Sequence, residues 1–267
     1  MKKHFLKLTV CFLTSFFAVL TLFFNPQINQ KPEKEYKILL MLSSFKRPIF
    51  LSGQISRLLN QTYKNHDISV SIKGIDGTAA FRNTFLREFD TFEKTGRVFV
   101  RMDENGPQLS NLLDTVRHLD VEKYDFFCKI DDDDWYAPDY VENVNREFNY
   151  LNNQTTPYLS SAYKNAYILN ENIDEAFLYK NNTDLLGPTL CFSKDLIKIA
   201  LEIDKDPSAI KKYAPTETAG DIHVREDKLL DHMALHQGIR IMRESEYPLV
   251  IYGWQYRSVM RNDRYRR

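Results

Sequence analysis

The sequence KILLMLS, from Lys37 to Ser43, is a continuous apolar run with the length of one β-strand. A strand in a parallel sheet has this composition when helices cover both faces of the sheet. A strand with one solvated face instead alternates apolar and polar residues. A helix is expected next, because Pro48 suits a first helical turn and apolar residues then recur at helical spacing, at Leu51, Ile55, Leu58 and Leu59. The stretch therefore predicts the first strand and helix of an α/β fold.

The same succession of strand and helix repeats as far as Tyr150. Strands are expected at Ile68–Ile72, Arg97–Met102 and Tyr124–Ile130, and helices at Leu109–Val116 and from Pro138 onward. Such alternation predicts a mostly parallel central sheet flanked by helices, and in such sheets ligands bind at the carboxyl ends of the strands.

Beyond Tyr150 the pattern is less regular. A last helix is expected at Arg225–Gln237, and strand-like segments occur at Tyr158–Ala162, Thr189–Phe192, Ile239–Met242 and Leu249–Tyr252. The polar stretch Asp204–Asp221 predicts a loop. The length of 267 residues suits one large α/β domain better than two small ones.

Composition excludes some classes of partner and site. Acidic and basic residues balance at 36 each, so no global charge would draw the protein onto nucleic acid. The three cysteines lie in apolar runs and are too few for a disulfide framework, so we expect buried free thiols at Cys11, Cys128 and Cys191. No zinc-ligand spacing is present.

The N-terminus contains an apolar segment of nearly a bilayer's thickness. Leu8–Phe24 is apolar apart from Thr and Ser, and Phe5 and Leu6 extend the run past Lys7. We expect a single-pass membrane anchor at residues 1–24, a linker at 25–36, the catalytic domain at 37–257 and a basic tail at 258–267. A cleaved signal peptide is the alternative, although no small-x-small site follows the apolar run. Lysines flank both ends of the run, so the side of the membrane that carries the catalytic domain stays open.

Four consecutive carboxylates, Asp131–Asp134, directly follow the strand expected at Tyr124–Ile130. Isolated, these charges would repel one another strongly, so a divalent cation with oxygen ligands is a natural reason to keep them together, and Mn²⁺ or Mg²⁺ fits best. A tight turn can aim the first and third carboxylates at one bound ion. The alternative is a solvated acidic loop, but this run ends a buried strand and so indicates a site.

Several segments of the chain together resemble the family 2 glycosyltransferases of the GT-A fold. They are KILLMLSSFKRPIFLSGQISRLLNQTY, VFVRMDENGPQLSNLLDTV, YDFFCKIDDDDWYAPDYVENV and REDKLLDHMALHQGIRIM, and they occur in the family's order over most of Lys37–Arg257. The resemblance implies a GT-A-type nucleotide-diphospho-sugar transferase fold, a nucleotide-sugar donor, and a glycan or lipid-linked saccharide as acceptor.

The resemblance also implies roles for the aspartate run. Asp131 would face the nucleoside or ribose and share the metal with Asp133, while Asp134 would support the pair. We count Asp132 and Trp135 with the donor site as well. The Trp135 ring would stack on a sugar or a nucleobase, and packing beside the sheet edge is an equal alternative.

Two further groups follow from the resemblance. Asp227 matches the base of an inverting transfer, with Glu226 as its neighbour, although acidic residues in a first helical turn are also ordinary dipole partners. Asp76 matches an aspartate that contacts the base of the nucleotide in that family. The family's usual paired aspartates are missing here, and Lys73-Gly74 stands near their place. A role of Asp76 as an ordinary turn residue is an equal alternative. Asn111 lies in a segment that passes near the donor in that family.

The sequence therefore predicts a metal-dependent glycosyltransferase anchored to a membrane. Two alternatives stay open: a non-catalytic nucleotide- or carbohydrate-binding protein of the same fold, and a metal-dependent nucleotidyltransferase. The histidines near the acidic pair are left out of the metal site, because a surface or core role is the commoner one, for His223, His232 and His236.

Overall fold

The computed structural model describes part of the chain: residues 34–45, 48–73, 87–103, 112–151, 159–163, 165–169, 176–180, 189–213, 239–243 and 250–252. The chain divides into two units, Met1–Lys34 and Glu35–Arg267. Every helix and strand reported below belongs to the second unit.

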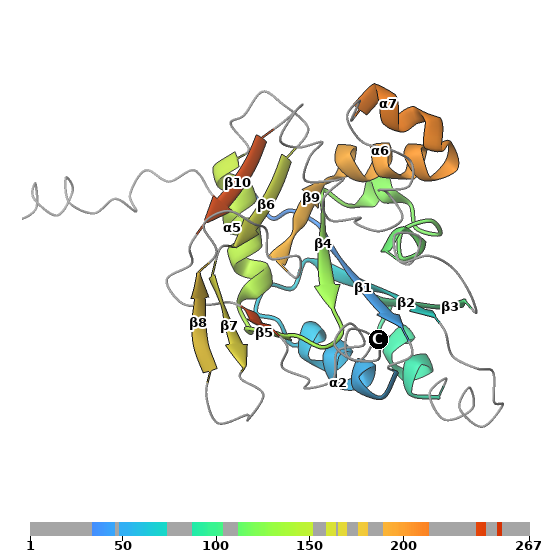
Figure 1. The fold of residues 1–267 in the computed structure, drawn as a ribbon. Coiled ribbons are helices and arrows are strands. Elements are labelled where there is room, and N and C mark those ends of the chain that lie inside the picture. Colours follow the sequence, from blue (N-terminus) through green and yellow to red (C-terminus); the bar gives the residue numbers. More distant parts are fainter. Residues whose placement is uncertain are drawn as a thin grey trace, which may run out of the picture. The chain divides into compact units, whose positions relative to one another are not determined.

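The larger of two sheets, called here the central sheet, has seven strands in the order β10-β6-β9-β4-β1-β2-β3 (Figure 1). Neighbouring strands pair in parallel except on both sides of β9, which runs antiparallel to β4 and β6. The prediction of a mostly parallel central sheet is confirmed. Its strands are β1 (Ile38–Phe45), β2 (His66–Lys73), β3 (Val98–Asp103), β4 (Phe126–Asp131), β6 (Leu159–Tyr163), β9 (Cys191–Ser193) and β10 (Ile239–Arg243).

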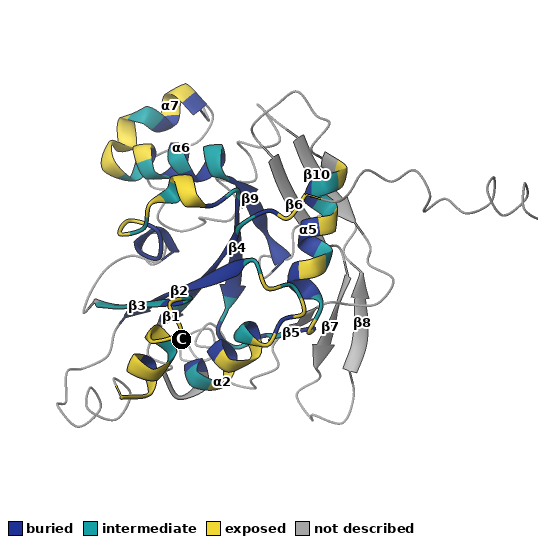
Figure 2. Cartoon of the chain, turned by 180° about the vertical axis from the view of Figure 1, so that it is seen from behind, coloured by how far each residue is buried: buried dark blue, intermediate teal, exposed yellow. Residues whose placement is uncertain are grey.

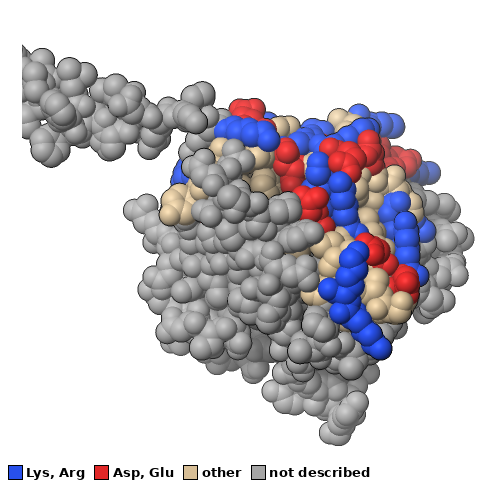
Figure 3. Space-filling view, turned by 90° about the horizontal axis from the view of Figure 1, so that it is seen from above, with Lys and Arg blue, Asp and Glu red and all other residues tan. Residues whose placement is uncertain are grey.

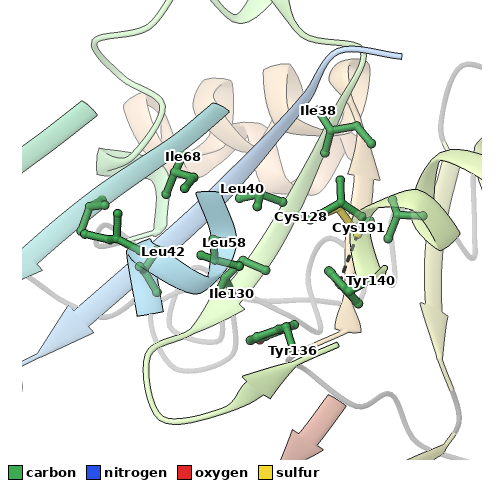
Figure 4. Packing of buried hydrophobic residues seen from close by; sticks show 14 of the residues in the cluster. Ile38, Leu40, Leu42, Leu58, Ile68, Cys128, Ile130, Tyr136, Tyr140 and Cys191 are labelled. Carbon is green, nitrogen blue, oxygen red and sulfur yellow. Dashed lines mark hydrogen bonds between the residues drawn. A yellow bond between two sulfur atoms is a disulfide. The ribbon is translucent and has the colours of Figure 1, made fainter. Parts of the chain in front are cut away.

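Strand β1 is the apolar run Lys37–Ser43 of the sequence, and alternate residues of it enter two apolar clusters on opposite faces of the sheet. Ile38, Leu40 and Leu42 pack in the first cluster with residues of helices α2 (Pro48–Leu59) and α5 (Tyr140–Leu151). Leu39 and Met41 pack in the second cluster with residues of helix α6 (Lys194–Lys205). Figure 4 shows the first cluster, and Figure 2 shows how β1, β2 and β4 are buried between these helices. Burial on both faces explains why the strand has no polar alternation.

A smaller sheet was not expected from the sequence. Its four strands have the order β5-β11-β7-β8. Strand β5 directly follows the aspartate run and pairs antiparallel with β11, so the residues Trp135 and Tyr136 are part of a sheet. The strands are β5 (Trp135–Tyr136), β7 (Asn165–Leu169), β8 (Ala176–Lys180) and β11 (Val250–Tyr252).

The loop predicted at Asp204–Asp221 is wrong in its first part. Helix α6 continues to Lys205, a 3₁₀ turn covers Pro207–Ala209, and the short helix α7 covers Ile210–Tyr213. The side chain of Asp206 accepts a hydrogen bond from the backbone N–H of Ser208, and Pro207 stands at the start of the turn. Capping by Asp and proline at a first position are ordinary helix-start signals, which the high polarity of the stretch obscured.

The expectation of free thiols at Cys128 and Cys191 is also wrong. The two residues form a disulfide bond between β4 and β9 (Figure 4). They stand opposite each other in the antiparallel register, with their Cα atoms 4.0 Å apart. Counting cysteines could not show this pairing, because it depends on β9 entering the sheet next to β4. Cys11 lies outside the described residues.

The membrane anchor is not tested by the described residues. None of the helices in the described ranges is long and apolar enough to cross a bilayer. The apolar segment Leu8–Phe24 lies outside those ranges.

Candidate metal and donor site

The aspartate run lies at the carboxyl edge of the central sheet. Asp131 is the last residue of β4, and it pairs in register with Ser43 near the end of β1. Ser43 pairs in turn with Ser71 near the end of β2. The next residues of the run form a turn that leads from β4 into β5. Because the carboxyl ends of parallel strands meet at one edge, this turn occupies the place where open α/β sheets bind ligands.

The four carboxylates differ in burial in an alternating way. Asp131 and Asp133 are partly exposed, whereas Asp132 and Asp134 are each only 1% exposed. The Oδ2 atom of Asp132 accepts a hydrogen bond of 2.5 Å from the hydroxyl of Ser44 on β1. The first and third carboxylates are therefore the accessible ones, and Asp132 connects the turn to β1 from inside the protein.

The backbone of the turn is held by buried side chains from other elements. The Nε2 group of Gln54, on α2, donates to the carbonyl oxygens of Asp131 at 3.2 Å and Asp134 at 3.0 Å. The N–H of Asp131 donates to the hydroxyl oxygen of Tyr136 at 2.9 Å. A second glutamine, Gln61, donates from Nε2 to the carbonyl of Ala137 at 2.7 Å. The turn is thus fixed through its main chain, which leaves its outward carboxylates in a set direction.

These supporting residues were missed from the sequence. Gln54 belongs to the buried stripe of α2 between Leu51 and Leu58, and it is 0% exposed. A polar side chain on an otherwise apolar helix face signals a buried hydrogen-bond partner, but the sequence does not say which one.

The aromatic pair after the run packs with the first apolar cluster. Tyr136 is 3% exposed and belongs to the first apolar cluster, and Trp135 is half-buried against the same cluster. Burial and the nearby carboxylates of Asp131 and Asp134 raise the pKa of Tyr136 well above its usual range. The phenol therefore stays neutral at ordinary pH, and its oxygen can accept the hydrogen bond from Asp131.

Two lysines of the central sheet are buried in ion pairs. Lys129, on β4, has its Nζ atom 3.5 Å from Oδ1 of Asp131. Lys73, at the end of β2, has its Nζ atom 2.5 Å from Oδ2 of Asp114. Arg117 also contacts Asp114 and extends this second pair to Asp204 on α6. Lys73, which stands near the place of the family's paired aspartates, is therefore held by a carboxylate that follows β3.

The described residues fit a divalent cation only if a ligand completes its coordination. No group of three or more His, Cys, Asp or Glu side chains in the described ranges is arranged to hold a metal ion. Asp131 and Asp133 nevertheless offer hard carboxylate oxygens on one turn. Mg²⁺ is commonly bound through one or two carboxylates together with substrate phosphates. The chemistry of this donor set fits such a shared ion.

The remaining candidates lie outside the described residues. They are Asp76, Asn111, Glu226 and Asp227. Their roles, and the roles assigned to Asp131–Asp134 and Trp135, stay predictions.

Comparison with known proteins gives matches to solved structures alone. No protein-family model matches the chain, and no curated protein matches it. The structure of S. aureus TarS has a TM-score of 0.53 at 12% identity, over 80% of this chain and 36% of TarS. TarS 1-349 in complex with UDP has a TM-score of 0.51 at 10% identity, over 80% of this chain and 60% of that one. The mannosyltransferase PcManGT from Pyrobaculum calidifontis, in complex with GDP-Man and Mn²⁺, has a TM-score of 0.44 at 13% identity. The match covers 70% of this chain and 53% of that one.

The likeness to TarS establishes the fold. TarS is a GT-A-like glycosyltransferase, and its likeness extends over 80% of this chain. The chain spans only 36% of the TarS structure. At this level of identity the comparison confirms the predicted GT-A-type fold, and the activity is a separate question.

Proposed function

We propose that the chain is a divalent-cation-dependent glycosyltransferase that moves a hexose from a nucleotide-sugar donor to a hydroxyl of a glycan or lipid-linked saccharide. One observation carries the proposal: two partly exposed carboxylates, Asp131 and Asp133, stand on a braced turn at the carboxyl edge of a GT-A-type sheet. The binding of UDP by TarS 1-349, which shares the fold, supports a nucleotide as part of the donor.

On the donor side, each residue has a proposed task. Asp131 accepts hydrogen bonds from the nucleoside or ribose and contributes to the cation with Asp133, while Asp132 and Asp134 support the turn from inside. Asp76, Asn111 and the edge of Trp135 complete the donor pocket. When bound, the cation offsets the negative charge that develops on the leaving diphosphate.

On the acceptor side, the proposed base is Asp227, with Glu226 beside it. The Asp227 carboxylate takes the proton of the acceptor hydroxyl as the oxygen of that hydroxyl forms its bond to the anomeric carbon. The bond from that carbon to the diphosphate breaks in the same step, so the nucleoside diphosphate leaves and the configuration at the carbon inverts.

We further propose that residues 1–24 anchor the enzyme in a membrane and that residues 25–36 connect the anchor to the catalytic domain at 37–257. The apolar length of the first segment supports the anchor. A catalytic domain held at a membrane would meet a lipid-linked acceptor at high local concentration.

The test is a nucleotide-release assay on the detergent-purified full chain. UDP- and GDP-sugars are screened with Mn²⁺ or Mg²⁺, and wild type is compared with Asp133→Ala and Asp227→Asn. Each substitution is expected to lower turnover by at least about a hundredfold, because each removes a group that acts in the transition state. Asp90→Ala removes an exposed carboxylate far along the chain from the run and is expected to leave turnover unchanged.

Three results would contradict the proposal in different ways. Cation-dependent donor binding without turnover, with glycan and lipid-linked acceptors supplied, would indicate a binding protein. Release of pyrophosphate from a nucleoside triphosphate would indicate a nucleotidyltransferase. Full activity in Asp133→Ala would show that Asp133 does not bind the metal.

A further inference from the structure

Lys129 is a buried cation near the centre of the central sheet. Its side chain is 8% exposed, and its Nζ atom is 3.5 Å from Oδ1 of Asp131. Because Lys129 and Asp131 are alternate residues of β4, their side chains leave the strand on the same face. Lys129 is level with Met41 of β1 on that face, where Phe127 and Met41 belong to the second apolar cluster.

Stability of the fold does not account for a lysine at this position. Taking an ammonium group out of water is costly, and a buried ion pair is often no more stable than apolar side chains of the same volume. Phe127 and Met41, on the same face of the sheet, are apolar and buried. Lys129 is paired, however, with one of the two partly exposed carboxylates of the candidate site. The positive charge therefore acts on whatever that site binds.

The sign of this charge opposes one ligand and favours another. A divalent cation at Asp131 or Asp133 is repelled by the ammonium group of Lys129, and an anionic diphosphate is attracted to it. At an effective dielectric constant of about 20 to 35, one unit charge at roughly 7 Å changes the affinity for another unit charge by about fiftyfold to tenfold. The effect is large because the side chain is buried and little screened by solvent.

We propose that Lys129 is a positioning residue that sets the order of binding at the carboxylate turn. Its fixed charge holds Asp131 in place and keeps the empty turn from binding a divalent cation tightly. The cation is then retained only together with a nucleoside diphosphate group, whose own negative charge offsets the ammonium. This inference rests on the proposed function and deepens it, since it assigns the residue that couples cation to donor.

The test uses isothermal titration of the full chain in detergent, with two probes. Mn²⁺ alone is titrated first, and UDP or GDP is then titrated at a fixed, saturating concentration of Mn²⁺. Lys129→Met keeps an unbranched side chain, one heavy atom shorter, and removes the charge. It is expected to bind Mn²⁺ alone about tenfold more tightly and the diphosphate about tenfold more weakly than wild type does. Opposite changes of this kind are the signature of charge, because a loss of packing would weaken both.

Two variants serve as controls. Lys129→Arg keeps the positive charge and is expected to bind both probes within about threefold of wild type, since the charge term is retained. Lys198→Gln removes an exposed cation that pairs with Glu122 on the surface, and it is expected to change neither affinity. Circular dichroism checks that each variant is folded. If Lys129→Met does not fold, Lys129→Gln makes the same comparison with a side chain that can still donate to Asp131.

Each other outcome overturns the inference. If Lys129→Met weakens both probes, or changes neither while wild type binds both, Lys129 has only a packing role and the proposed glycosyltransferase function stands. If wild type binds neither Mn²⁺ nor a nucleoside diphosphate, the inference and the proposed function both fail.

Discussion

Gln54 lies outside the aspartate run and donates two hydrogen bonds to the backbone of the run, at the carbonyls of Asp131 and Asp134. Gln54→Leu would leave the part-buried carbonyl of Asp131 and the buried carbonyl of Asp134 without this donor. We expect a loss of about 1–3 kcal/mol in the free energy of unfolding. We also expect a tenfold to hundredfold fall, roughly, in Mn²⁺-dependent turnover, since groups that orient ligands have effects of about that size.

The matched control for this prediction is Gln61→Leu. Gln61 is as buried as Gln54, but it bonds to Ala137 and Val141, beyond the run. Its loss should lower stability by a similar amount and leave the dependence of turnover on Mn²⁺ concentration near that of wild type. Denaturant unfolding and turnover at graded Mn²⁺ measure the two effects. An equal change in Mn²⁺ dependence in both variants would show that Gln54 has no special role.

His66 makes the stability of the domain depend on pH. Burial and the nearby Arg97 guanidinium lower the pKa of His66 from 6.5 to about 4, against weaker opposing effects of the carbonyls of Leu58 and Tyr63 and of Asp67. In the unfolded chain His66 is protonated below about pH 6.5, whereas in the folded chain it is protonated only below about pH 4. The contribution of His66 to the free energy of unfolding is therefore fully present above the unfolded pKa. It is lost as the pH is lowered toward the folded pKa, by about 3 kcal/mol in all.

Urea unfolding at pH values between 7.5 and 4.5, roughly the range over which histidine changes charge, would check the His66 prediction. His66→Gln should lower stability at neutral pH and flatten its dependence on pH. His118→Gln changes an exposed histidine and should keep the slope of wild type. If the stability of His66→Gln depends on pH as steeply as that of wild type, groups other than His66 cause the effect.

At the residue scale, the sequence predicted that the aspartate run follows a buried strand and that a turn there can aim its first and third carboxylates at one bound ion. It could not predict what holds the run. The contact of Ser44 with Asp132 spans 88 residues, and that of Gln54 with Asp134 spans 80. Such contacts depend on how the elements pack, so residue types alone do not reveal them.

At the scale of elements, the strands of the central sheet were predicted, and so was the segment that forms β11. Strands β5, β7 and β8 of the smaller sheet were not. The segment at β1 shows its burial on both faces directly in its composition. Strands β7 and β8 are short, and the pairing of β7 with β11 has no local signal. Helix α6 was overlooked although Leu196, Ile197, Ala200 and Ile203 recur at helical spacing and are buried. The reversed direction of β9 has no sequence signature either.

The disulfide between β4 and β9 should stabilise the central sheet. It closes a loop with a sequence separation of 63, and a cross-link of such length typically contributes about 2–4 kcal/mol by restricting the unfolded chain. The double variant Cys128→Ala with Cys191→Ala is expected to lose about that amount in denaturant unfolding. Wild type unfolded with a strong reductant present should match it, and Cys11→Ala should not differ from wild type. Equal stability of double variant and oxidised wild type would contradict the prediction.

At the scale of the whole molecule, the described elements all belong to the unit Glu35–Arg267, and their surface charge is mixed. Figure 3 shows acidic and basic side chains interspersed over the described part of one face. This arrangement agrees with the equal numbers of acidic and basic residues in the sequence. Interspersed charge of this kind leaves no large single-sign area on the described part of that face.

Removal of residues 1–24 should release a soluble domain that still turns over donor slowly. The unit Glu35–Arg267 is compact by itself. Fractionation of cells and the nucleotide-release assay measure the two properties. A variant that lacks only residues 258–267 should stay with the membranes, like the full chain. An insoluble or inactive product from the first deletion would place the boundary of the domain elsewhere.

The bond between Cys128 and Cys191 also makes part of the chain a closed covalent ring. The aspartate turn, α5 and the strands β5, β7 and β8 lie within that ring, and β1, β2, β3 and α7 lie outside it. A protease that cuts once between the two cysteines opens the ring without separating the pieces. The nicked protein would migrate as one chain on a gel run without reductant and as two fragments after reduction, so the turn that carries the carboxylates stays attached to the sheet even when its own loop is cut.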